Sequence, residues 1–154
     1  MKRTSFITLL ILLIFLVLPA CQENEWADWK LQNEQWLATN KKQLGVVTTE
    51  SGLQYKVLYQ GWKFNKKPNT NSLIKVSYTG KLIDGTTFDC DTNAVFYMSS
   101  VIDGWSEGIA KMNGGGSYML YIPSALAYDT TSTNSAIPPY STLIFEVDLV
   151  DSYN

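Results

Sequence analysis

The chain has 154 residues and a formal net charge of −2, is 45% hydrophobic, and contains no histidine. This length suits one domain with additional segments, and the apolar fraction is sufficient for a buried core. The lack of histidine excludes Ser-His-Asp and Cys-His catalysis as well as His-ligated zinc sites. Because the small net charge is negative, it does not attract nucleic acid, and we expect no nucleic-acid partner.

Residues 1–20 have the layout of a bacterial export signal. Two basic residues precede an apolar run from Phe6 to Leu18, which is short for a membrane-spanning helix. The segment Leu18-Pro19-Ala20-Cys21 resembles a lipobox, although proline is unusual there. The pattern predicts a signal peptide over 1–20, a lipid anchor on Cys21, and a place in the bacterial cell envelope, on the periplasmic side or surface of a membrane. An ordinary secretory signal, with Cys21 as a free thiol, is the alternative.

Residues 21–50 are predicted to form an anchor and a helical segment. Trp26, Trp29 and Trp36 fall on one helical stripe, and Gly45 is a helix stop signal. A short helix is not stable alone, so the stripe must pack on the chain's own domain, on a second copy, or on another partner. The shortness of the segment favours its own domain.

From residue 51 onward, apolar side chains alternate with polar ones, which is typical of strands. The alternating stretches are Leu53–Tyr59, Ile74–Tyr78, Tyr118–Ile122 and Leu143–Leu149. Asp84-Gly85 is a hairpin turn signal, and the lysine- and asparagine-rich stretch Lys63–Asn71 is typical of a loop. The sequence therefore predicts a mostly antiparallel sheet.

One stretch has a helical period instead. Trp105, Ile109 and Met112 recur at i, i+4 and i+7 within Asp103–Asn113, and the following Gly114-Gly115-Gly116 would end a helix. The predicted fold class is therefore α+β: an antiparallel sheet with one short helix in a domain over 51–154, preceded by a short N-terminal helix.

The domain carries a series of motifs that resembles the FKBP-type peptidyl-prolyl cis/trans isomerases. They are Val76-Ser77-Tyr78-Thr79-Gly80, Asp84-Gly85-Thr86-Thr87-Phe88-Asp89, Val101-Ile102-Asp103-Gly104-Trp105-Ser106-Glu107-Gly108, Ile122-Pro123, Leu126-Ala127-Tyr128, Ile137-Pro138-Pro139 and Leu143-Ile144-Phe145-Glu146-Val147. Any single aromatic residue among them is explained by core packing, whereas their order and spacing from about residue 51 to residue 151 are specific. The resemblance implies a half-barrel sheet wrapped around the short helix, with a hydrophobic pocket between them.

The resemblance also implies which residues form the site. The implied catalytic residues are Tyr78, Phe88, Asp89, Trp105, Tyr128 and Phe145, and the implied substrate-binding residues are Val101, Ile102 and Ile137. In the family, groups at the positions of the Ile102 N–H and the Tyr128 hydroxyl bind ligand carbonyls. Trp105 would form the floor, and Asp89 would orient Tyr78 or accept a hydrogen bond from the substrate. No cofactor or metal is implied.

The sequence departs from the family at the rim of this pocket. Ala94 stands where eukaryotic members commonly have an aromatic residue, and Ala136 replaces a larger apolar residue. Asp129 stands where glycine is usual, which indicates a backbone with positive φ. Aspartate adopts that conformation with modest strain, so we expect the turn to be kept.

By resemblance, the chain would isomerise X-Pro bonds and assist the folding of exported proteins. Its substrates would be proline-containing unfolded or exported polypeptides, and macrolide immunosuppressants would be possible ligands. The alternative is an FKBP-fold binding module or chaperone with little isomerase turnover. The retained pocket core favours the enzyme, and the altered rim favours the alternative.

The lipid anchor gives the first testable prediction. Changing Cys21→Ala removes the thiol that would be acylated, so we expect acyl labelling to be lost and an uncleaved precursor or a soluble species to accumulate. Metabolic labelling with a fatty acid, followed by membrane fractionation, measures both effects. Normal labelling and membrane retention of the variant would reject the anchor.

Overall fold

The computed structural model describes residues 26–62, 67–131 and 136–153. The predicted signal peptide, Cys21 and part of the predicted Lys63–Asn71 loop lie outside the described residues. Over the three described ranges, no helix has both the length and the apolar character needed to cross a membrane.

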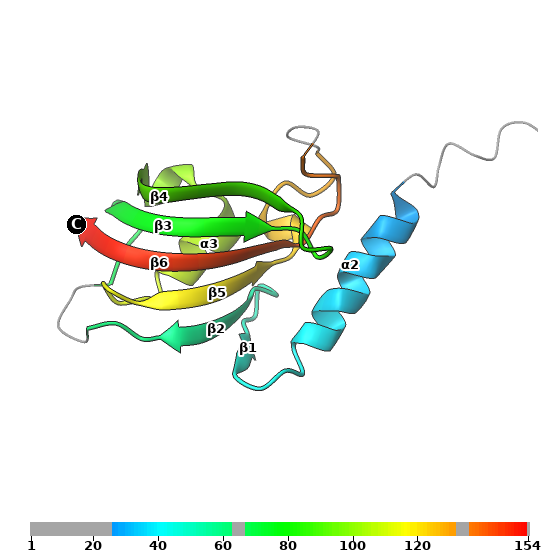
Figure 1. Ribbon diagram of the computed structural model, residues 1–154, viewed down its shortest axis with the longest axis horizontal. Helices are drawn as coiled ribbons and strands as arrows, with labels where there is room; N and C mark the ends of the chain where they lie inside the picture. Colours follow the sequence, from blue (N-terminus) through cyan, green and yellow to red (C-terminus); the bar gives the residue numbers. More distant parts are fainter. Residues whose placement is uncertain (1–25, 63–66, 132–135, 154) are drawn as a thin grey trace, which may run out of the picture.

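Within the described residues, six antiparallel strands form one sheet in the order β1-β2-β5-β6-β3-β4 (Figure 1). The strands are β1 (Val46–Thr48), β2 (Gln54–Tyr59), β3 (Leu73–Lys81), β4 (Thr87–Tyr97), β5 (Ser117–Ile122) and β6 (Leu143–Tyr153). The four alternating stretches are confirmed as β2, β3, β5 and β6. Strands β1 and β4 were not predicted, because β1 is short and β4 is largely exposed, with little alternation.

Asp84-Gly85 makes the predicted turn between β3 and β4. The Gly85 N–H donates to the Leu82 carbonyl at 3.0 Å, and the Thr86 N–H donates to Asp84 Oδ1 at 2.8 Å. Gly85 has a φ of 88°, which glycine adopts without strain. The turn chemistry of the sequence therefore sets this hairpin.

The inner face of the sheet forms the core against helix α3 (Asp103–Ile109). Fully buried side chains on that face include Val76, Leu120, Ile122 and Val147. The half-barrel around one short helix is thus confirmed. The helix ends at Ile109, earlier than the predicted Asn113, and Met112 is buried in the turn that follows.

Two glycines let α3 approach β5 closely. A Cβ atom on Gly104 would lie 2.3 Å from Ile122 Cγ2, and one on Gly108 would lie 2.6 Å from Leu120 Cδ2. Real Cβ atoms do not come this close to other heavy atoms, so any side chain at either position would push the helix from the sheet or displace the strand residues. The spacing of the two glycines, one helical turn apart, keeps this face of α3 flat.

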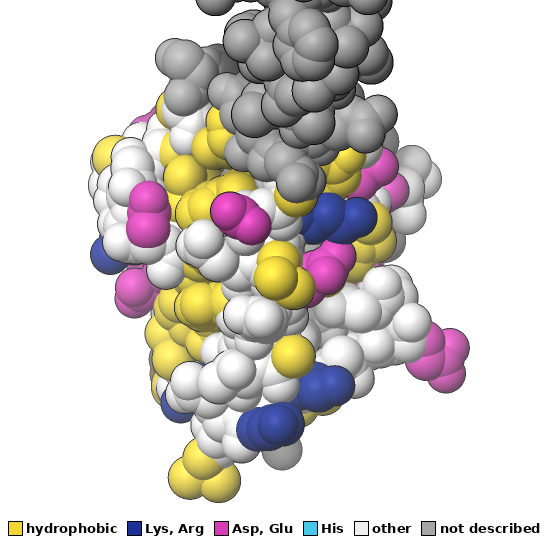
Figure 2. Space-filling model, turned by 90° about the vertical axis from the view of Figure 1, so that its right-hand side faces the viewer, with side chains coloured by type: hydrophobic (Ala, Val, Ile, Leu, Met, Phe, Trp, Pro, Cys, Tyr) yellow, Lys and Arg dark blue, Asp and Glu magenta, His cyan; other side chains and the backbone are white. Residues whose placement is uncertain are grey.

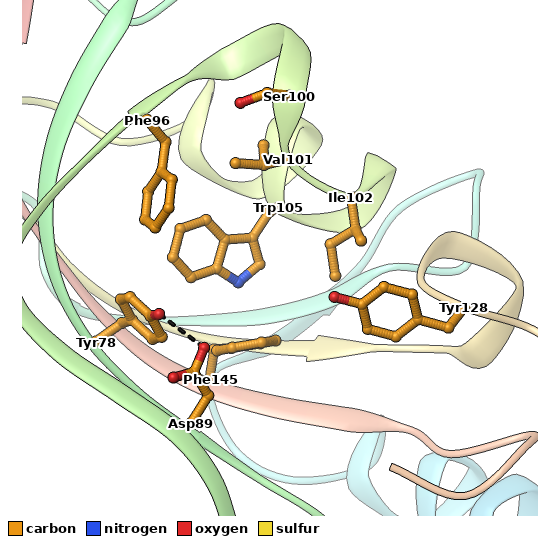
Figure 3. Close-up of a pocket in the computed structure, with 9 residues that line it drawn as sticks. All are labelled: Tyr78, Asp89, Phe96, Ser100, Val101, Ile102, Trp105, Tyr128 and Phe145. Carbon is orange, nitrogen blue, oxygen red and sulfur yellow. Dashed lines mark hydrogen bonds between the residues drawn. The ribbon is translucent and has the colours of Figure 1, made fainter. Parts of the chain in front are cut away.

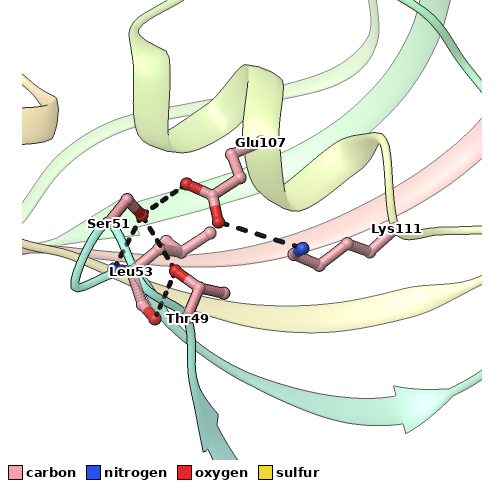
Figure 4. Close-up of polar contacts among 5 residues, drawn as sticks. All are labelled: Thr49, Ser51, Leu53, Glu107 and Lys111. Carbon is pink, nitrogen blue, oxygen red and sulfur yellow. Dashed lines mark hydrogen bonds and ion pairs between the residues drawn. The ribbon is translucent and has the colours of Figure 1, made fainter.

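Polar contacts on the outer side of α3 tie it to the turn between β1 and β2 (Figure 4). Ser51 Oγ donates to Glu107 Oε2 at 2.5 Å, and Lys111 Nζ lies 3.8 Å from Glu107 Oε1. Thr49 Oγ1 lies 2.8 Å from Ser51 Oγ and donates to the Leu53 carbonyl at 3.3 Å. These contacts are partly exposed and weak singly, but together they restrain the helix that carries Trp105.

The predicted N-terminal helix is present as α2 (Ala27–Asn40), beside one end of the sheet (Figure 1). It ends five residues before the predicted stop at Gly45, and Trp26 precedes its first turn, with 37% of its surface exposed. Trp29 and Trp36 are half-buried, and the Trp36 ring lies 5.6 Å from that of Tyr121.

The buried residues of α2 are asparagines. Asn33 and Asn40 are 2% and 5% exposed, and Asn40 Nδ2 donates to Gln54 Oε1 at 3.0 Å. Gln54 Nε2 in turn donates to the carbonyl of Leu37 at 3.0 Å. The helix therefore packs on the chain's own domain, as expected, but amide hydrogen bonds accompany the tryptophan contacts.

The close approach of α3 to β5 predicts that Gly108→Ala destabilises the fold. The added methyl group must displace Leu120 or the helix, and overpacking of this kind costs about 1–3 kcal/mol. Urea unfolding followed by circular dichroism measures the change in the free energy of unfolding. Ser106→Ala, on the same helix but away from β5, is the control; an equal effect of both variants would contradict the packing argument.

Candidate functional site

A cavity of about 290 Å³ opens between α3 and the concave face of the sheet (Figure 3). It is lined by Tyr78, Asp89, Phe96, Ser100, Val101, Ile102, Trp105, Tyr128 and Phe145. These residues come from strands β3, β4 and β6, from α3, from the short segment just before α3, and from the connection between β5 and β6. The structure thus brings together residues from distant parts of the sequence at one place.

Trp105 forms the floor of the cavity. It is 4% exposed and is surrounded by aromatic rings. Its ring centroid lies 5.1 Å from that of Tyr78, 5.2 Å from that of Phe145 and 5.9 Å from that of Phe96. The interplanar angles of 79° to 90° are those of edge-to-face pairs, which are favourable for aromatic rings. Within the described residues, the buried Trp105 Nε1 has no hydrogen-bond partner.

Tyr78 and Asp89 form the polar side of the cavity. The Tyr78 hydroxyl donates to Asp89 Oδ2 at 2.8 Å, so Asp89 orients Tyr78, which is one of the two roles expected for it. Burial raises the pKa of Tyr78 well above its ordinary value, and the adjacent Asp89 carboxylate, which accepts the hydrogen bond and would repel a tyrosinate, raises it further. The hydroxyl therefore stays a neutral donor.

Ile102 and Tyr128 face each other at the mouth (Figure 3). The Ile102 carbonyl accepts hydrogen bonds from the N–H groups of Trp105 and Ser106, whereas its own N–H has no backbone acceptor among the described residues. Tyr128 is 37% exposed, and Figure 3 shows its hydroxyl directed into the cavity. Two groups that can bind carbonyl oxygens therefore border an apolar space.

Two expected site residues lie outside the lining. Phe88 packs behind Phe145, with ring centroids 5.4 Å apart, and Gly80 makes room for this pair, since a Cβ there would lie 2.7 Å from both rings. Ile137 is 5% exposed and belongs to the hydrophobic core. Phe88 therefore supports the cavity indirectly, through its contact with the lining residue Phe145.

Two lining residues, Phe96 and Ser100, were not predicted from the sequence. Phe96 fills the side of the cavity near the small buried Ala94, and Ser100 lies beside Val101. Phe96 lies two residues after Ala94 in β4, and side chains two residues apart in a strand point to the same face. A strand prediction there would therefore have placed both on the inner face. Strand β4 is irregular, however: Asn93 has a φ of 63°, and the β3–β4 register shifts between Val76 and Tyr78.

The rim contains Asp129 in the expected left-handed backbone conformation. Asp129 has a φ of 49°, as its place in the sequence predicted, and its side chain is exposed next to Tyr128. Its N–H donates to the Ser124 carbonyl at 2.8 Å, and its carbonyl accepts from the Tyr140 N–H at 2.7 Å. The turn is therefore kept without glycine.

The cavity can hold an apolar ring on Trp105 while donors at the mouth bind carbonyl oxygens. Over the ranges that the structure describes, no three His, Cys, Asp or Glu side chains gather where they could hold a metal ion. The arrangement suits a non-covalent process that depends on shape, desolvation and a few fixed dipoles.

Comparison with known proteins decides the family. The family of FKBP-type peptidyl-prolyl cis-trans isomerases matches residues 65–150, and the domain amino-terminal to such isomerases matches residues 18–57. The chain belongs to the FKBP-type peptidyl-prolyl cis-trans isomerase family. It is 42% identical over 125 residues to a probable isomerase of this type, FkpA, from Neisseria meningitidis, and 43% identical over 121 residues to a 22 kDa isomerase of Escherichia coli.

Solved structures of FKBP relatives share the fold. FkpA from Escherichia coli is 35% identical, with a TM-score of 0.80 over 84% of this chain and 62% of that chain. A Pseudomonas syringae isomerase is 30% identical, with a TM-score of 0.78 over 84% of this chain and 96% of that one. The match to the Neisseria and 22 kDa proteins covers 79% and 76% of this chain but 45% and 58% of those relatives, so the chain spans about half their length.

The Tyr78–Asp89 pair gives a prediction for the FKBP pocket. Asp89→Asn keeps an oxygen that accepts the hydrogen bond but removes the negative charge, so the pKa of Tyr78 should fall toward its ordinary value. Nuclear magnetic resonance of ring-labelled tyrosine during an alkaline titration measures this pKa. Asp84→Asn, in the exposed β3–β4 turn, is the control and should leave it unchanged. An unaltered Tyr78 titration in Asp89→Asn would show that the carboxylate does not set it.

Proposed function

We propose that the chain is a peptidyl-prolyl cis/trans isomerase that acts on proline-containing polypeptides exported to the bacterial envelope. The observation that carries the proposal is the apolar cavity with Trp105 at its floor and the Ile102 N–H and Tyr128 hydroxyl at its mouth. Membership of the FKBP family supports the same activity.

The reaction needs no proton transfer and no nucleophile. An X-Pro bond isomerises slowly because twisting it breaks amide resonance, with a barrier of about 18–20 kcal/mol. The twisted amide has less charge separation than the planar amide, so transfer from water into an apolar pocket favours it. Catalysis follows if the pocket binds the twisted state more tightly than either planar state.

The residues of the cavity have distinct parts in this mechanism. The proline ring would lie on Trp105, enclosed by Phe96 and Phe145. The Ile102 N–H and the Tyr128 hydroxyl would donate to carbonyls that flank the bond as it turns. Because Asp89 already holds the Tyr78 hydroxyl at 2.8 Å, Tyr78 would act as a fixed wall whose polar atom is satisfied.

The place of the protein in the cell is part of the proposal. We assign residues 1–20 to a signal peptide, 21–50 to an anchor and helical segment, and 51–154 to the isomerase domain, with a lipid on Cys21. The lipobox-like segment supports the anchor, and a relative in Legionella longbeachae, 38% identical, is named as the outer membrane protein MIP. Several acyl chains on one residue would anchor the protein stably.

An isomerisation assay tests the function. A soluble chain of residues 22–154 should accelerate cis-to-trans conversion of a proline-containing peptide and the refolding of a protein limited by proline isomerisation. Binding of unfolded polypeptide without acceleration of either reaction would reject the enzyme and favour the FKBP-fold binding module.

The hydroxyl at the mouth gives a sharper prediction. Tyr128→Phe removes a donor to the substrate and should lower kcat/KM about fivefold, the rate equivalent of one net hydrogen bond, with the fold intact. The peptide assay measures the rate, and circular dichroism checks the fold. Full activity of Tyr128→Phe would remove Tyr128 from the site.

Ligand binding tests the same cavity independently. A macrolide immunosuppressant should compete with substrate and quench tryptophan fluorescence, and the quenching should be absent in Trp105→Phe. Unchanged quenching in that variant would place the macrolide elsewhere.

A further inference from the structure

Helix α2 contacts three consecutive residues just before β6. Lys30 Nζ lies 5.1 Å from the ring centroid of Tyr140, and Trp29 Nε1 donates to Ser141 Oγ at 3.0 Å. The Thr142 N–H donates to Asn33 Oδ1 at 2.7 Å. One face of α2 thus contacts every residue of segment 140–142, which lies far from the helix in the sequence.

The last two of these contacts are well enclosed. Asn33, Ser141 and Thr142 are 2%, 4% and 1% exposed. Both polar atoms of the Asn33 amide are hydrogen-bonded, because its Nδ2 also donates to the carbonyl of Trp29 at 2.8 Å. Removal of this side chain would leave a buried N–H without an acceptor, which is more costly than the loss of an exposed hydrogen bond.

The segment held by α2 is in turn bonded to the mouth of the pocket. The Tyr140 N–H donates to the Asp129 carbonyl at 2.7 Å, and Asp129 follows Tyr128 directly. Tyr140 and Asp129 have φ angles of 62° and 49°, a left-handed conformation that strains tyrosine and, more modestly, aspartate. Two strained residues are therefore bonded to each other, between α2 on one side and Tyr128 on the other.

The described surface on the side of α2 is mixed in character. Figure 2 shows the face of the molecule on which α2 lies, with side chains of both charges interspersed among polar and hydrophobic ones. The contacts of α2 that are both buried and specific point inward, to residues 140–142 and to Gln54. These contacts therefore join α2 to the rest of its own domain.

We propose that Asn33 and Trp29 are positioning residues for the isomerase site. They fix segment 140–142, and the bond from Tyr140 to Asp129 then sets the place of the Tyr128 hydroxyl at the mouth. The catalytic consequence rests on the isomerase function proposed above, whereas the effect on the 128–129 turn does not. The helix next to the N-terminal segment thereby controls the pocket.

The experiment compares Asn33→Ala with Gln32→Ala in the full chain, purified in detergent. Both changes remove an amide from α2, but Gln32 is exposed on the outer face. Trp29→Phe is a milder second variant that keeps an aromatic ring, smaller than the indole, and removes the N–H donor to Ser141. Thermal unfolding confirms that each variant is folded at the assay temperature.

The first measurement is hydrogen exchange of the Asp129 and Tyr140 amides by nuclear magnetic resonance, which needs no activity. Exchange of both amides should accelerate in Asn33→Ala and Trp29→Phe, relative to amides of β3 and β6, and stay unchanged in Gln32→Ala. Unchanged exchange in the first two variants, or equal acceleration across the domain, would overturn the proposal.

The second measurement is a double-mutant cycle on kcat/KM with Tyr128→Phe. Asn33→Ala should lower kcat/KM about fivefold in the wild type but have little effect when Tyr128 already lacks its hydroxyl, because both changes act through the same group. Losses that simply multiply would overturn the positioning role. A wild-type chain without isomerase activity would reject the proposed function instead. The exchange measurement would then test only whether Asn33 and Trp29 fix the 128–129 turn.

Discussion

The close approach of α3 to β5 is the constraint on which the pocket depends. Gly104 and Gly108 have no side chains on the face that meets Ile122 and Leu120, so the helix lies directly on the sheet. This contact leaves Trp105 at the right depth to meet the rings of β3, β4 and β6 at 5.1 to 5.9 Å. A bulkier helix face would raise the floor of the pocket and separate these rings, because closely packed interiors yield little to added volume.

The lining of the pocket is mostly apolar, which suits the proposed reaction. Its walls are aromatic and aliphatic, and its main polar pair, Tyr78 with Asp89, is already satisfied internally. Among the described residues, Trp105 Nε1 is a buried donor without a partner, and it borders the space where a substrate would lie. A site of this kind can favour a less polar, twisted amide over a planar one, and it has no need of the histidine that the sequence lacks.

The N-terminal helix is joined to the domain by buried amide hydrogen bonds as well as by the aromatic contacts of Trp29 and Trp36. Asn33 and Asn40 are buried and paired with groups of the loop before β6 and of β2. Buried amides need defined hydrogen-bond partners, so this contact specifies one orientation of α2. A purely apolar helix face would fix the orientation less strictly. The chain spans about half the length of relatives such as the 22 kDa isomerase, of which 58% is matched. The described helix is hydrogen-bonded to residues 141, 142 and 54 of its own domain.

Local patterns in the amino-acid order were sufficient for much of this protein. Alternation predicted β2, β3, β5 and β6, and Asp84-Gly85 predicted the hairpin between β3 and β4. The family resemblance of the motif series implied one site that includes Tyr78, Asp89, Val101, Ile102, Trp105, Tyr128 and Phe145, and these residues line one cavity in the structure. Local patterns failed where geometry depends on register and on polar partners. The irregular β4 brings Phe96 to the cavity, and the packing behind Phe145 keeps Phe88 out of it. The docking of α2 was beyond reach in detail, because buried asparagines leave no apolar period in the sequence and their partners, such as Thr142, are distant along the chain.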